Sequence, residues 1–255
     1  MIEAIDLAKK YGDLVALKGI NFKISAGKVV GLLGPNGAGK TSTMRILTTF
    51  LPPTSGTARI AGYDICQEAD AVRRCIGYLP ETPPLYAEMR VGQYLKFVAK
   101  IKGVPAANIS SYVDEAIERS AIQSVRERLC GNLSKGFRQR VGLAQALVHK
   151  PRVVILDEPT SGLDPAQIIE IRRLISGLCE DHTVILSTHI LAEVAQVCTD
   201  VIIIANGSIV ADGSIEELTR EKSLEERFME AIAGERLGEK VFPDNRLAYS
   251  GEQAA

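Results

Sequence analysis

Short apolar runs alternate along this chain with longer stretches in which apolar residues recur at helical spacing. We interpret five apolar runs as strands: Ile20–Ile24, Val29–Leu33, Val153–Leu156, Thr183–Leu186 and Asp200–Ile204. Runs of this kind, separated by helical stretches, are typical of a sheet whose two faces are both covered. The pattern therefore predicts an α/β fold.

The stretch from 82 to 151 has a different pattern. It opens with Pro83-Pro84 and lacks strong β-forming runs. Its apolar residues recur at helical spacing near three segments: Val91–Ile101, Ile109–Ile122 and Arg138–His149. We interpret it as an α-helical subdomain inserted into the α/β core.

Capping signals predict three further helices. Asp164 followed by Pro165 and Gln167 predicts a helix that runs to about Cys179. Ser214-Ile215-Glu216-Glu217 and Ser223-Leu224-Glu225-Glu226 are two capping boxes, which predict two short C-terminal helices. We expect a domain over 1–236 that includes a C-terminal helical extension over 214–236, followed by a disordered tail over 237–255.

Composition narrows the class of protein. The formal net charge of −1 over 255 residues gives no electrostatic reason to expect a nucleic-acid partner. The five cysteines contain no C-x-x-C pair, which fits reduced thiols in the cytoplasm. The acidic segment Met1–Asp6 lacks the layout of a signal peptide, and no apolar run approaches the roughly 18 residues of a membrane span. Any role at a membrane would require a separate membrane partner.

The segment Gly34-Pro35-Asn36-Gly37-Ala38-Gly39-Lys40-Thr41 carries the clearest chemistry. It fits G-x-x-x-x-G-K-[ST], and it lies between the strand-like run Val29–Leu33 and the helical start Ser42–Leu47. Glycines allow backbone N–H groups to turn toward a phosphate, and a helix N-terminus favours an anion. Lys40 supplies a charge for the β- and γ-phosphates, and the Thr41 hydroxyl is a ligand for Mg²⁺.

A second acidic motif follows an apolar strand. Val153–Leu156 leads into Asp157 and Glu158. Alone, such a run is most often a strand that ends in a solvated turn. Beside a phosphate loop, Asp157 suits Mg²⁺ binding and Glu158 suits activation of the attacking water.

The segment Leu133-Ser134-Lys135-Gly136-Phe137-Arg138-Gln139-Arg140 resembles the signature motif of ATP-binding cassette (ABC) ATPases, LSGGQ. Ser134 and Gly136 match positions that face the γ-phosphate in that family, while Lys135 and Phe137 depart from the motif. Four other segments follow the family order. Lys9–Gly12 resembles the A-loop, Ile76–Glu81 the Q-loop with glutamate replacing glutamine, Ser161–Asp164 the D-loop, and Ser187–His189 the H-switch.

This resemblance, over about residues 2–213, implies a P-loop NTPase core with a mixed sheet, an N-terminal antiparallel β part and the inserted helical subdomain. It implies ATP and Mg²⁺ as cofactors. The implied catalytic residues are Lys40, Glu158 and His189, and the implied metal ligands are Thr41, Glu81 and Asp157. The implied nucleotide-binding set is Tyr11, Gly34, Pro35, Asn36, Gly37, Ala38, Gly39, Lys40, Thr41, Ser42, Glu81, Ser134, Gly136 and Asp164.

The function implied is that of an ATP-hydrolysing subunit that powers a membrane transporter. It would lie on the cytoplasmic membrane face through a transmembrane permease, as a homodimer or a heterodimer with another ATP-binding subunit. The Glu81 loop with Pro83-Pro84 and the C-terminal helices resemble ATPases of ABC-2 type exporters.

Three other functions compete with this one. A cassette ATPase acting on DNA would carry a long coiled coil, for which the insert is too short, and one acting on ribosomes would carry two cassettes. A small-molecule kinase would need an acceptor site that the sequence does not show. A non-hydrolysing regulatory subunit would not require Glu158 and His189. The cargo is not encoded in any motif of this chain.

Overall fold

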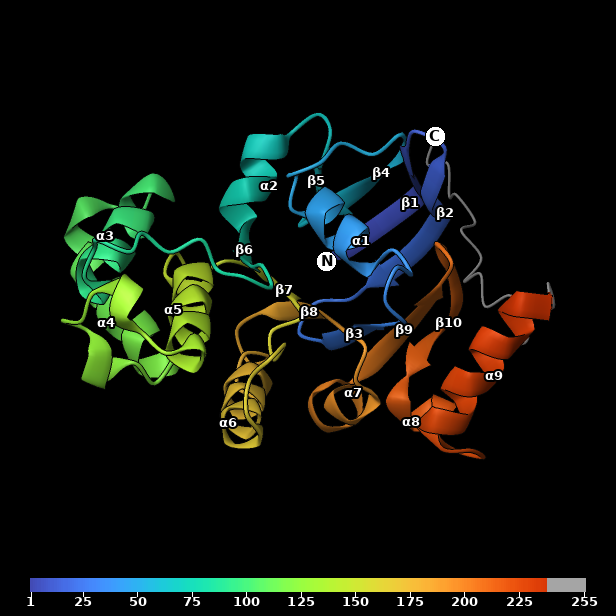
Figure 1. The fold of residues 1–255 in the computed structure, drawn as a ribbon. Helices are drawn as coiled ribbons and strands as arrows, with labels where there is room; N and C mark the ends of the chain where they lie inside the picture. Colours follow the sequence, from blue (N-terminus) through green and yellow to red (C-terminus); the bar gives the residue numbers. More distant parts are fainter. Residues whose placement is uncertain (238–255) are drawn as a thin grey trace.

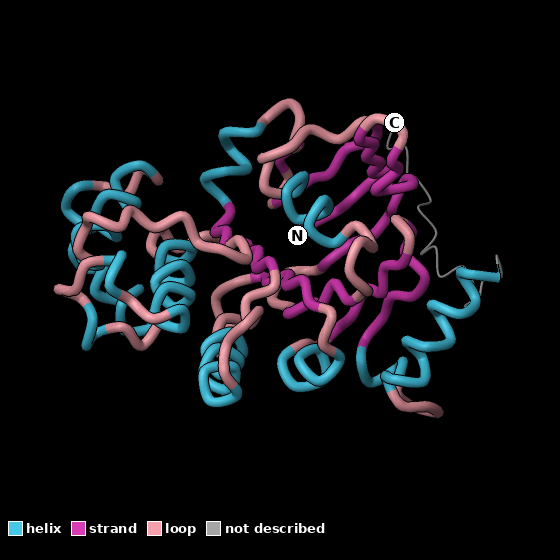
Figure 2. Tube along the Cα trace, in the orientation of Figure 1, coloured by secondary structure: helices cyan, strands magenta, loops and turns pink. Residues whose placement is uncertain are grey.

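A computed structural model describes residues 1–237 of the chain (Figure 1). Two sheets and several helices form one half of the molecule, and a further group of helices stands apart at the left of Figure 2. Two chain segments connect the helical group to the sheets, one before the group in the sequence and one after it. This arrangement matches the predicted α/β core with a helical insertion.

The larger sheet has six strands in the order β10-β9-β3-β8-β7-β6. All neighbours are parallel except the β9–β10 pair. Every residue of the central strands β3, β7 and β8 is buried, because helices or the second sheet cover both faces. The six strands are β3 (Val29–Leu33), β6 (Ile76–Leu79), β7 (Val153–Asp157), β8 (Thr183–Thr188), β9 (Asp200–Ala205) and β10 (Ser208–Ser214).

The smaller sheet is antiparallel, in the order β2-β1-β4-β5. Its strands are β1 (Ile2–Tyr11), β2 (Leu14–Ile24), β4 (Ser55–Ile60) and β5 (Tyr63–Asp64). The run Ile20–Ile24 lies here, so our expectation that it joins a sheet covered on both faces is wrong. Its residues alternate between buried and exposed, because this sheet buries only one face.

Helices cover the larger sheet on both faces. Helix α1 (Lys40–Leu47) lies between the two sheets and shares a core with them through Met44, Ile46 and Leu47. Helices α6 (Pro165–Ser176) and α7 (Leu191–Val197) pack on the opposite face. The short α2 (Ala69–Cys75) leads into β6. Helix α6 ends three residues before the predicted Cys179, because Gly177 closes it.

The helical insert has a core of its own, formed around Val91, Leu95, Val113, Ile117 and Val141. Its helices are α3 (Val91–Ile101), α4 (Ile109–Arg119) and α5 (Lys135–Leu147), with 3-10 turns at Ala106–Asn108, Gln123–Val125 and Cys130–Asn132. The first matches its predicted bounds. The second stops before Ile122, where Ala121 adopts a positive φ of 51°. The third begins before Arg138, because Ser134 Oγ caps it by accepting from Phe137 N.

The C-terminal segment carries both predicted capping boxes. Ser214 caps α8 (Ile215–Leu218), and Ser223 exchanges hydrogen bonds with Glu226 at the start of α9 (Leu224–Leu237). The second helix is longer than predicted, because buried Leu224 and Ala231 pack it against β9 and β10. Apart from Leu237, the predicted tail over 237–255 lies outside the described residues.

The predicted fold class is confirmed: an α/β P-loop core with a mixed sheet, an antiparallel N-terminal part and an inserted helical group. The domain limits 1–236, 82–151 and 214–236 stay predictions. Within the described residues, no helix combines the length and the apolar character that a membrane crossing needs.

Candidate functional site

The predicted phosphate-binding, catalytic and metal-binding residues gather where parallel strands end. β3, β8 and β7 are successive neighbours, so their carboxyl ends meet at one edge of the sheet. The phosphate loop follows β3, Asp157 and Glu158 close β7, and Thr188 and His189 close β8. A crevice beyond the carboxyl ends of parallel strands is where open α/β sheets bind ligands. Strand pairing alone therefore assembles the centre of the site.

The phosphate loop requires glycine at two places for steric reasons. A Cβ on Gly34 would lie 2.2 Å from the carbonyl oxygen of Ile204. Gly39 has a φ of +110°, and a Cβ there would lie 2.7 Å from the carbonyl oxygen of Ala16. The loop can therefore adopt this tight path against its neighbours only without these side chains. It ends at Lys40, the first residue of α1, two residues earlier than the predicted helical start.

Lys40 is buried, with 5% of its surface exposed, and its ammonium group is surrounded by oxygens. Its Nζ donates to the carbonyl oxygens of Gly34 at 2.8 Å and Pro35 at 3.2 Å. It also lies 3.4 Å from Glu158 Oε1. A buried cation held at the mouth of a phosphate loop is a strong partner for phosphate oxygens.

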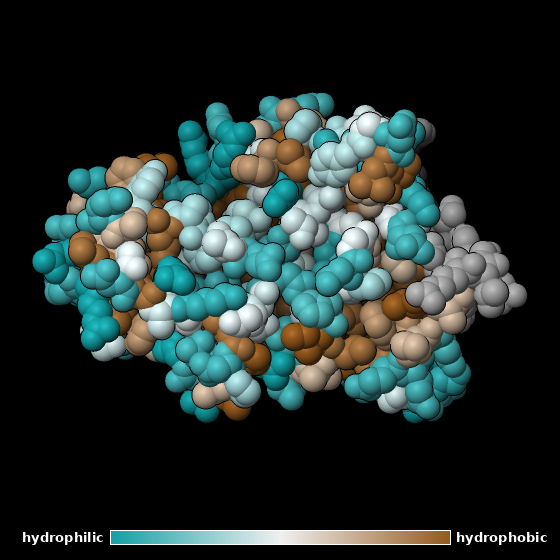
Figure 3. Space-filling model, in the orientation of Figure 1, coloured by the Kyte–Doolittle hydropathy of each residue, from teal (hydrophilic) through white to brown (hydrophobic). Residues whose placement is uncertain are grey.

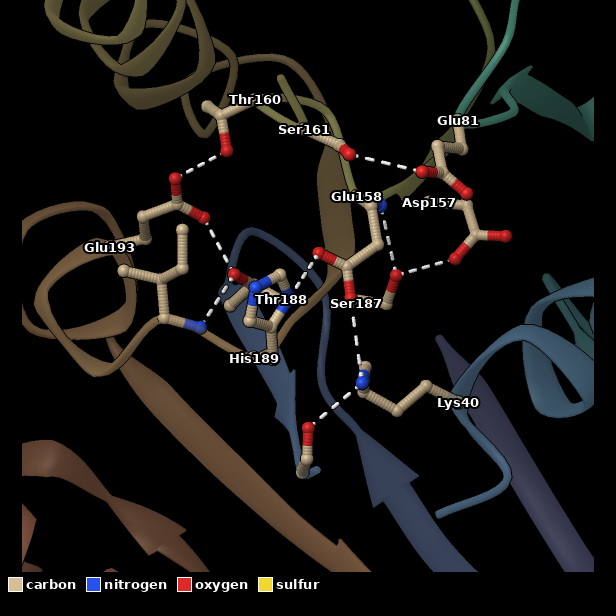
Figure 4. A network of polar contacts seen from close by, with 12 residues as sticks. Lys40, Glu81, Asp157, Glu158, Thr160, Ser161, Ser187, Thr188, His189 and Glu193 are labelled. Carbon is tan, nitrogen blue, oxygen red and sulfur yellow. Dashed lines mark hydrogen bonds and ion pairs between the residues drawn. The ribbon is translucent and has the colours of Figure 1, made fainter. Parts of the chain in front are cut away.

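Glu158 lies at the centre of the polar network in Figure 4. Its second oxygen, Oε2, lies 2.9 Å from Nδ1 of His189. Its backbone adopts a positive φ of 47°, and its N–H donates both to Ser187 Oγ at 3.0 Å and to Ser187 O at 3.2 Å. These bonds to β8 hold an unfavourable backbone conformation that aims the carboxylate toward Lys40 and His189.

Asp157 is almost fully buried, with 3% exposure. Ser187 Oγ donates to its Oδ1 at 2.6 Å, and Thr41 Oγ1 lies 3.5 Å from the same oxygen. Burial raises the pKa of the Asp157 carboxyl, and the nearby Glu81 charge raises it further, while the bond from Ser187 opposes the rise. A cation bound here would reverse that effect, because it favours the ionised form.

The structure brings Glu81, the predicted Q-loop residue, to the same edge. Ser161 Oγ donates to Glu81 Oε1 at 3.0 Å, so the entrance of the helical insert touches the predicted D-loop (Figure 4). Thr41, Asp157 and Glu81 supply one hydroxyl and two carboxylates. Mg²⁺ commonly takes one or two carboxylates together with substrate phosphates, so this donor set fits the ion. In the described residues, no group of three or more His, Cys, Asp or Glu forms a metal cage.

Tyr11 and Asp164 lie at the periphery. The Tyr11 ring is partly exposed at the end of β1, and its hydroxyl lies 3.4 Å from Ser42 Oγ on α1. Asp164 caps α6 through a bond from Gln167 N at 2.9 Å, as the sequence predicts. The Tyr11–Ser42 contact places the partly exposed ring beside the start of α1, and Lys9 Nζ lies 5.2 Å from the ring centroid.

Ser134 and Gly136 are not joined to the phosphate loop. Ser134 is exposed and caps α5, and a Cβ on Gly136 would lie 2.6 Å from the Gln167 side chain. Among the interactions of residues 1–237, none links either residue to Gly34–Thr41. Within one chain, the signature segment and the loop are therefore separate surfaces.

Sequence reasoning assigned no role to four polar residues of the network: Thr160, Ser187, Thr188 and Glu193. Ser187 pairs directly with Asp157 across β7 and β8, and Glu193 accepts from the hydroxyls of Thr160 and Thr188. Three of them, Thr160, Ser187 and Thr188, lie within two residues of Glu158 or His189 in the sequence, and this position was the one signal that could have identified them. For Glu193, nothing in the local pattern of α7 distinguished it from a surface glutamate.

The face of the molecule in Figure 3 is largely hydrophilic around α1 and the surrounding loops. Hydrophobic atoms gather over the helical insert at the left and near α7 and α8 at the lower right. The polar character of the centre suits a charged ligand.

Comparisons with known proteins agree with this geometry. Residues 17–161 match the family described as ABC transporter. The uncharacterized ABC transporter ATP-binding protein YxlF of Bacillus subtilis (strain 168) is 38% identical over 222 residues, which cover 87% of this chain and 74% of the relative. The bacitracin transport ATP-binding protein BcrA of Bacillus licheniformis is also 38% identical over 222 residues, covering 86% of this chain and 72% of the relative.

Among solved structures, cbiO1 from Clostridium perfringens, described as part of the ABC transporter complex cbiONQ, superposes with a TM-score of 0.78. It is 31% identical and covers 93% of this chain and 95% of its own. The family match spans more than half of this chain, and both relatives align over most of their own length. The phosphate loop, the acidic end of β7 and the histidine after β8 thus belong to an ATPase, and this chain is a member of the ABC transporter ATP-binding family.

Proposed function

We propose that this ATPase powers an exporter by closing as a dimer on MgATP and passing that motion to a separate transmembrane permease. The observation that carries the proposal is the division of the site. Lys40, Glu158 and His189 form one connected group, while Ser134 and Gly136 lie apart from it on the same chain. ATP held between two chains would unite the two surfaces.

The residues of the connected group divide the chemistry among them. Lys40 holds the β- and γ-phosphates by charge, together with backbone N–H groups of the phosphate loop and the start of α1. Glu158 accepts a proton from the water that attacks the γ-phosphorus, in line with the breaking bond from that phosphorus to the ADP oxygen. His189, held by Glu158, contacts the γ-phosphate.

Thr41, Asp157 and Glu81 would hold the magnesium ion. When bound, Mg²⁺ offsets negative charge on the phosphate oxygens. Ser187 orients the Asp157 carboxylate toward this position through its 2.6 Å bond. Glu81 differs from the glutamine of the family motif in carrying a full charge, which strengthens attraction to the ion.

Tyr11 and Asp164 complete the nucleotide site. The exposed face of Tyr11 offers a stacking surface for adenine beside Ser42. Asp164 closes the D-loop whose Ser161 contacts Glu81. Ser134 and Gly136 of the second chain would face the γ-phosphate. A homodimer would contain two complete sites, because one chain carries every residue of both surfaces.

The helical insert is the surface we assign to the permease. Tyr86, with 52% of its surface exposed, follows the Glu81 loop and packs edge-on against Tyr94 and Phe97. An exposed aromatic residue beside the Glu81 loop suits contact with another protein. This contact would hold the ATPase at the cytoplasmic membrane face. The resemblance to transport proteins such as BcrA favours this role over one at nucleic acid.

Isolation of the tagged chain from native membranes tests the proposal. We expect a membrane-spanning protein to co-purify and to change the rate of ATP hydrolysis, with uptake of cargo into inside-out vesicles. A chain that purifies from membranes without such a partner, while hydrolysing ATP, would retain the ATPase and overturn the transporter role. Tyr86→Ala is the matched variant, because it removes an exposed ring outside the nucleotide site.

A further inference from the structure

The buried carboxylate of Glu193 contacts the loops that carry the candidate site. Glu193, in the first turn of α7, is 2% exposed. Its Oε2 accepts from Thr188 Oγ1 at 2.6 Å, and its Oε1 accepts from Thr160 Oγ1. Figure 4 shows the carboxylate between these two hydroxyls. A buried carboxylate is costly without such partners, so the bonds define its place in the fold.

The two hydroxyls come from the two loops that carry the proposed catalytic pair. Thr160 follows Glu158 by two residues and directly precedes the segment Ser161–Asp164. Thr188 directly precedes His189, and its Oγ1 also accepts from Ile190 N at 3.0 Å. One carboxylate is therefore bonded to both sides of the Glu158–His189 contact.

Helix α6 also contacts the Glu193 carboxylate. Arg172 on α6 lies 3.5 Å from Glu193 Oε1 and donates to Gln196 Oε1 at 2.9 Å. Glu193 thus connects the ends of β7 and β8 with α6 and α7. The partners of its carboxylate are Thr160, Thr188 and Arg172, and among the described residues no bond joins it to Lys40 or Glu158.

We propose that Glu193 is a positioning residue for hydrolysis: it holds Thr160 and Thr188 so that Glu158 and His189 keep their separation. This inference rests on the proposed roles of Glu158 and His189. Small displacements of reacting groups reduce turnover strongly, whereas nucleotide affinity comes mainly from Lys40 and the phosphate loop. Loss of the carboxylate therefore lowers kcat and leaves the KM for ATP nearly unchanged.

Two substitutions at Glu193 should lower kcat to different extents. Glu193→Gln keeps the shape and one acceptor oxygen, and we expect kcat to fall about tenfold. Glu193→Ala leaves both hydroxyls without their acceptor, and we expect a fall of about a hundredfold. In both variants, the KM for ATP should stay within about twofold of wild type. Greater activity in the glutamine variant than in alanine is the expected rescue.

The matched control is Val194→Ala, the next residue of the same helix. Val194 is fully buried against β3, so this change weakens the packing of α7 without touching the carboxylate. Each rate is expressed per folded molecule, measured by circular dichroism. A kcat in Glu193→Gln that matches wild type, or a fall no larger than in Val194→Ala, would overturn the positioning role.

Thr160→Val and Thr188→Val supply a second measurement that does not depend on the fate of Glu193 variants. Each removes one hydroxyl and keeps the shape. Both variants should lower kcat with little change in KM. When either is combined with Glu193→Gln, the fold-loss of kcat should be smaller than the product of the two separate fold-losses. Full additivity would show independent roles and contradict the inference. Failure of the proposed role of Glu158 is separate, because it would appear as normal hydrolysis by Glu158→Gln, and failure of the transporter role would appear as the absence of a membrane partner.

Discussion

Nδ1 of His189 lies 2.9 Å from Oε2 of Glu158. An ionised carboxylate only accepts hydrogen bonds, so the His189 ring nitrogen is the donor in this contact. The other oxygen of Glu158 faces Lys40 at 3.4 Å. The Glu158 carboxylate is therefore placed between a cation and a histidine.

Glu158→Gln should leave ATP binding intact and stop turnover. The amide keeps the shape of the side chain but lacks the basic oxygen that must accept a proton from water. With MgATP, the variant should accumulate as a stable dimer by light scattering, while a nucleotide titration gives wild-type affinity. A variant that stays monomeric and hydrolyses ATP at the normal rate would show that Glu158 is not the base.

Ser134→Arg should block dimer closure without disturbing the fold, because Ser134 is exposed. Lys40→Ala should lose nucleotide binding, since it removes the charged phosphate contact. A mixed dimer of the two variants has one intact and one doubly damaged site. If the sites act independently, an equal mixture should recover about a quarter of wild-type hydrolysis.

Each variant alone, measured at the same total concentration, is the control for the mixing experiment. Both homodimers should be nearly inactive. Full activity of the Ser134→Arg homodimer would contradict the arrangement in which one chain completes the site of the other.

Glu81 should tolerate glutamine better than alanine. The glutamine carbonyl still offers an oxygen to Mg²⁺ and to Ser161, whereas alanine offers none. Glu81→Gln should require more Mg²⁺ for half-maximal hydrolysis, because a neutral ligand attracts the ion less. The measurement is the ATPase rate against Mg²⁺ concentration, with and without the membrane partner. If Glu81→Ala hydrolyses ATP like wild type in both conditions, Glu81 does not contribute to Mg²⁺ binding.

Protonation of His149 should destabilise the fold as the pH falls. Its Nε2 bonds to Ile76 O at 2.8 Å, and within the described residues its buried Nδ1 has no partner. Burial, with a smaller effect from Lys102, lowers its pKa from 6.5 to about 4. Between these values the unfolded chain binds the proton and the folded chain does not, so stability is lost as pH falls, by up to about 1.4 kcal/mol per unit.

His149→Gln tests this dependence, because its amide can still donate to Ile76 O and does not titrate. The free energy of unfolding, from urea titrations between pH 6.5 and 4, should vary less steeply in the variant than in wild type. Equal slopes would show that His149 does not contribute.

Local signals in the sequence determined much of the fold. The phosphate loop, the capping residues Asp164, Ser214 and Ser223, and helix Val91–Ile101 stand where predicted. Each depends on bonds between residues close in the chain or on a short apolar period. The order of the motifs also predicted the family, which the relatives confirm.

Tertiary structure decided which strands become neighbours and what meets at their ends. Ile20–Ile24 lies in the antiparallel sheet, and its alternating apolar and polar residues fit one buried face without specifying which strands lie beside it. Ser187 meets Asp157 because β7 and β8 pair in register, and Glu193 meets Thr160 because α7 packs beside the end of β7. Contacts between residues about 30 positions apart depend on register and packing, which the local pattern of hydrophobic and polar residues does not encode. The sequence alone therefore determined the chemical groups of the site, and only the folded chain determined which of them touch.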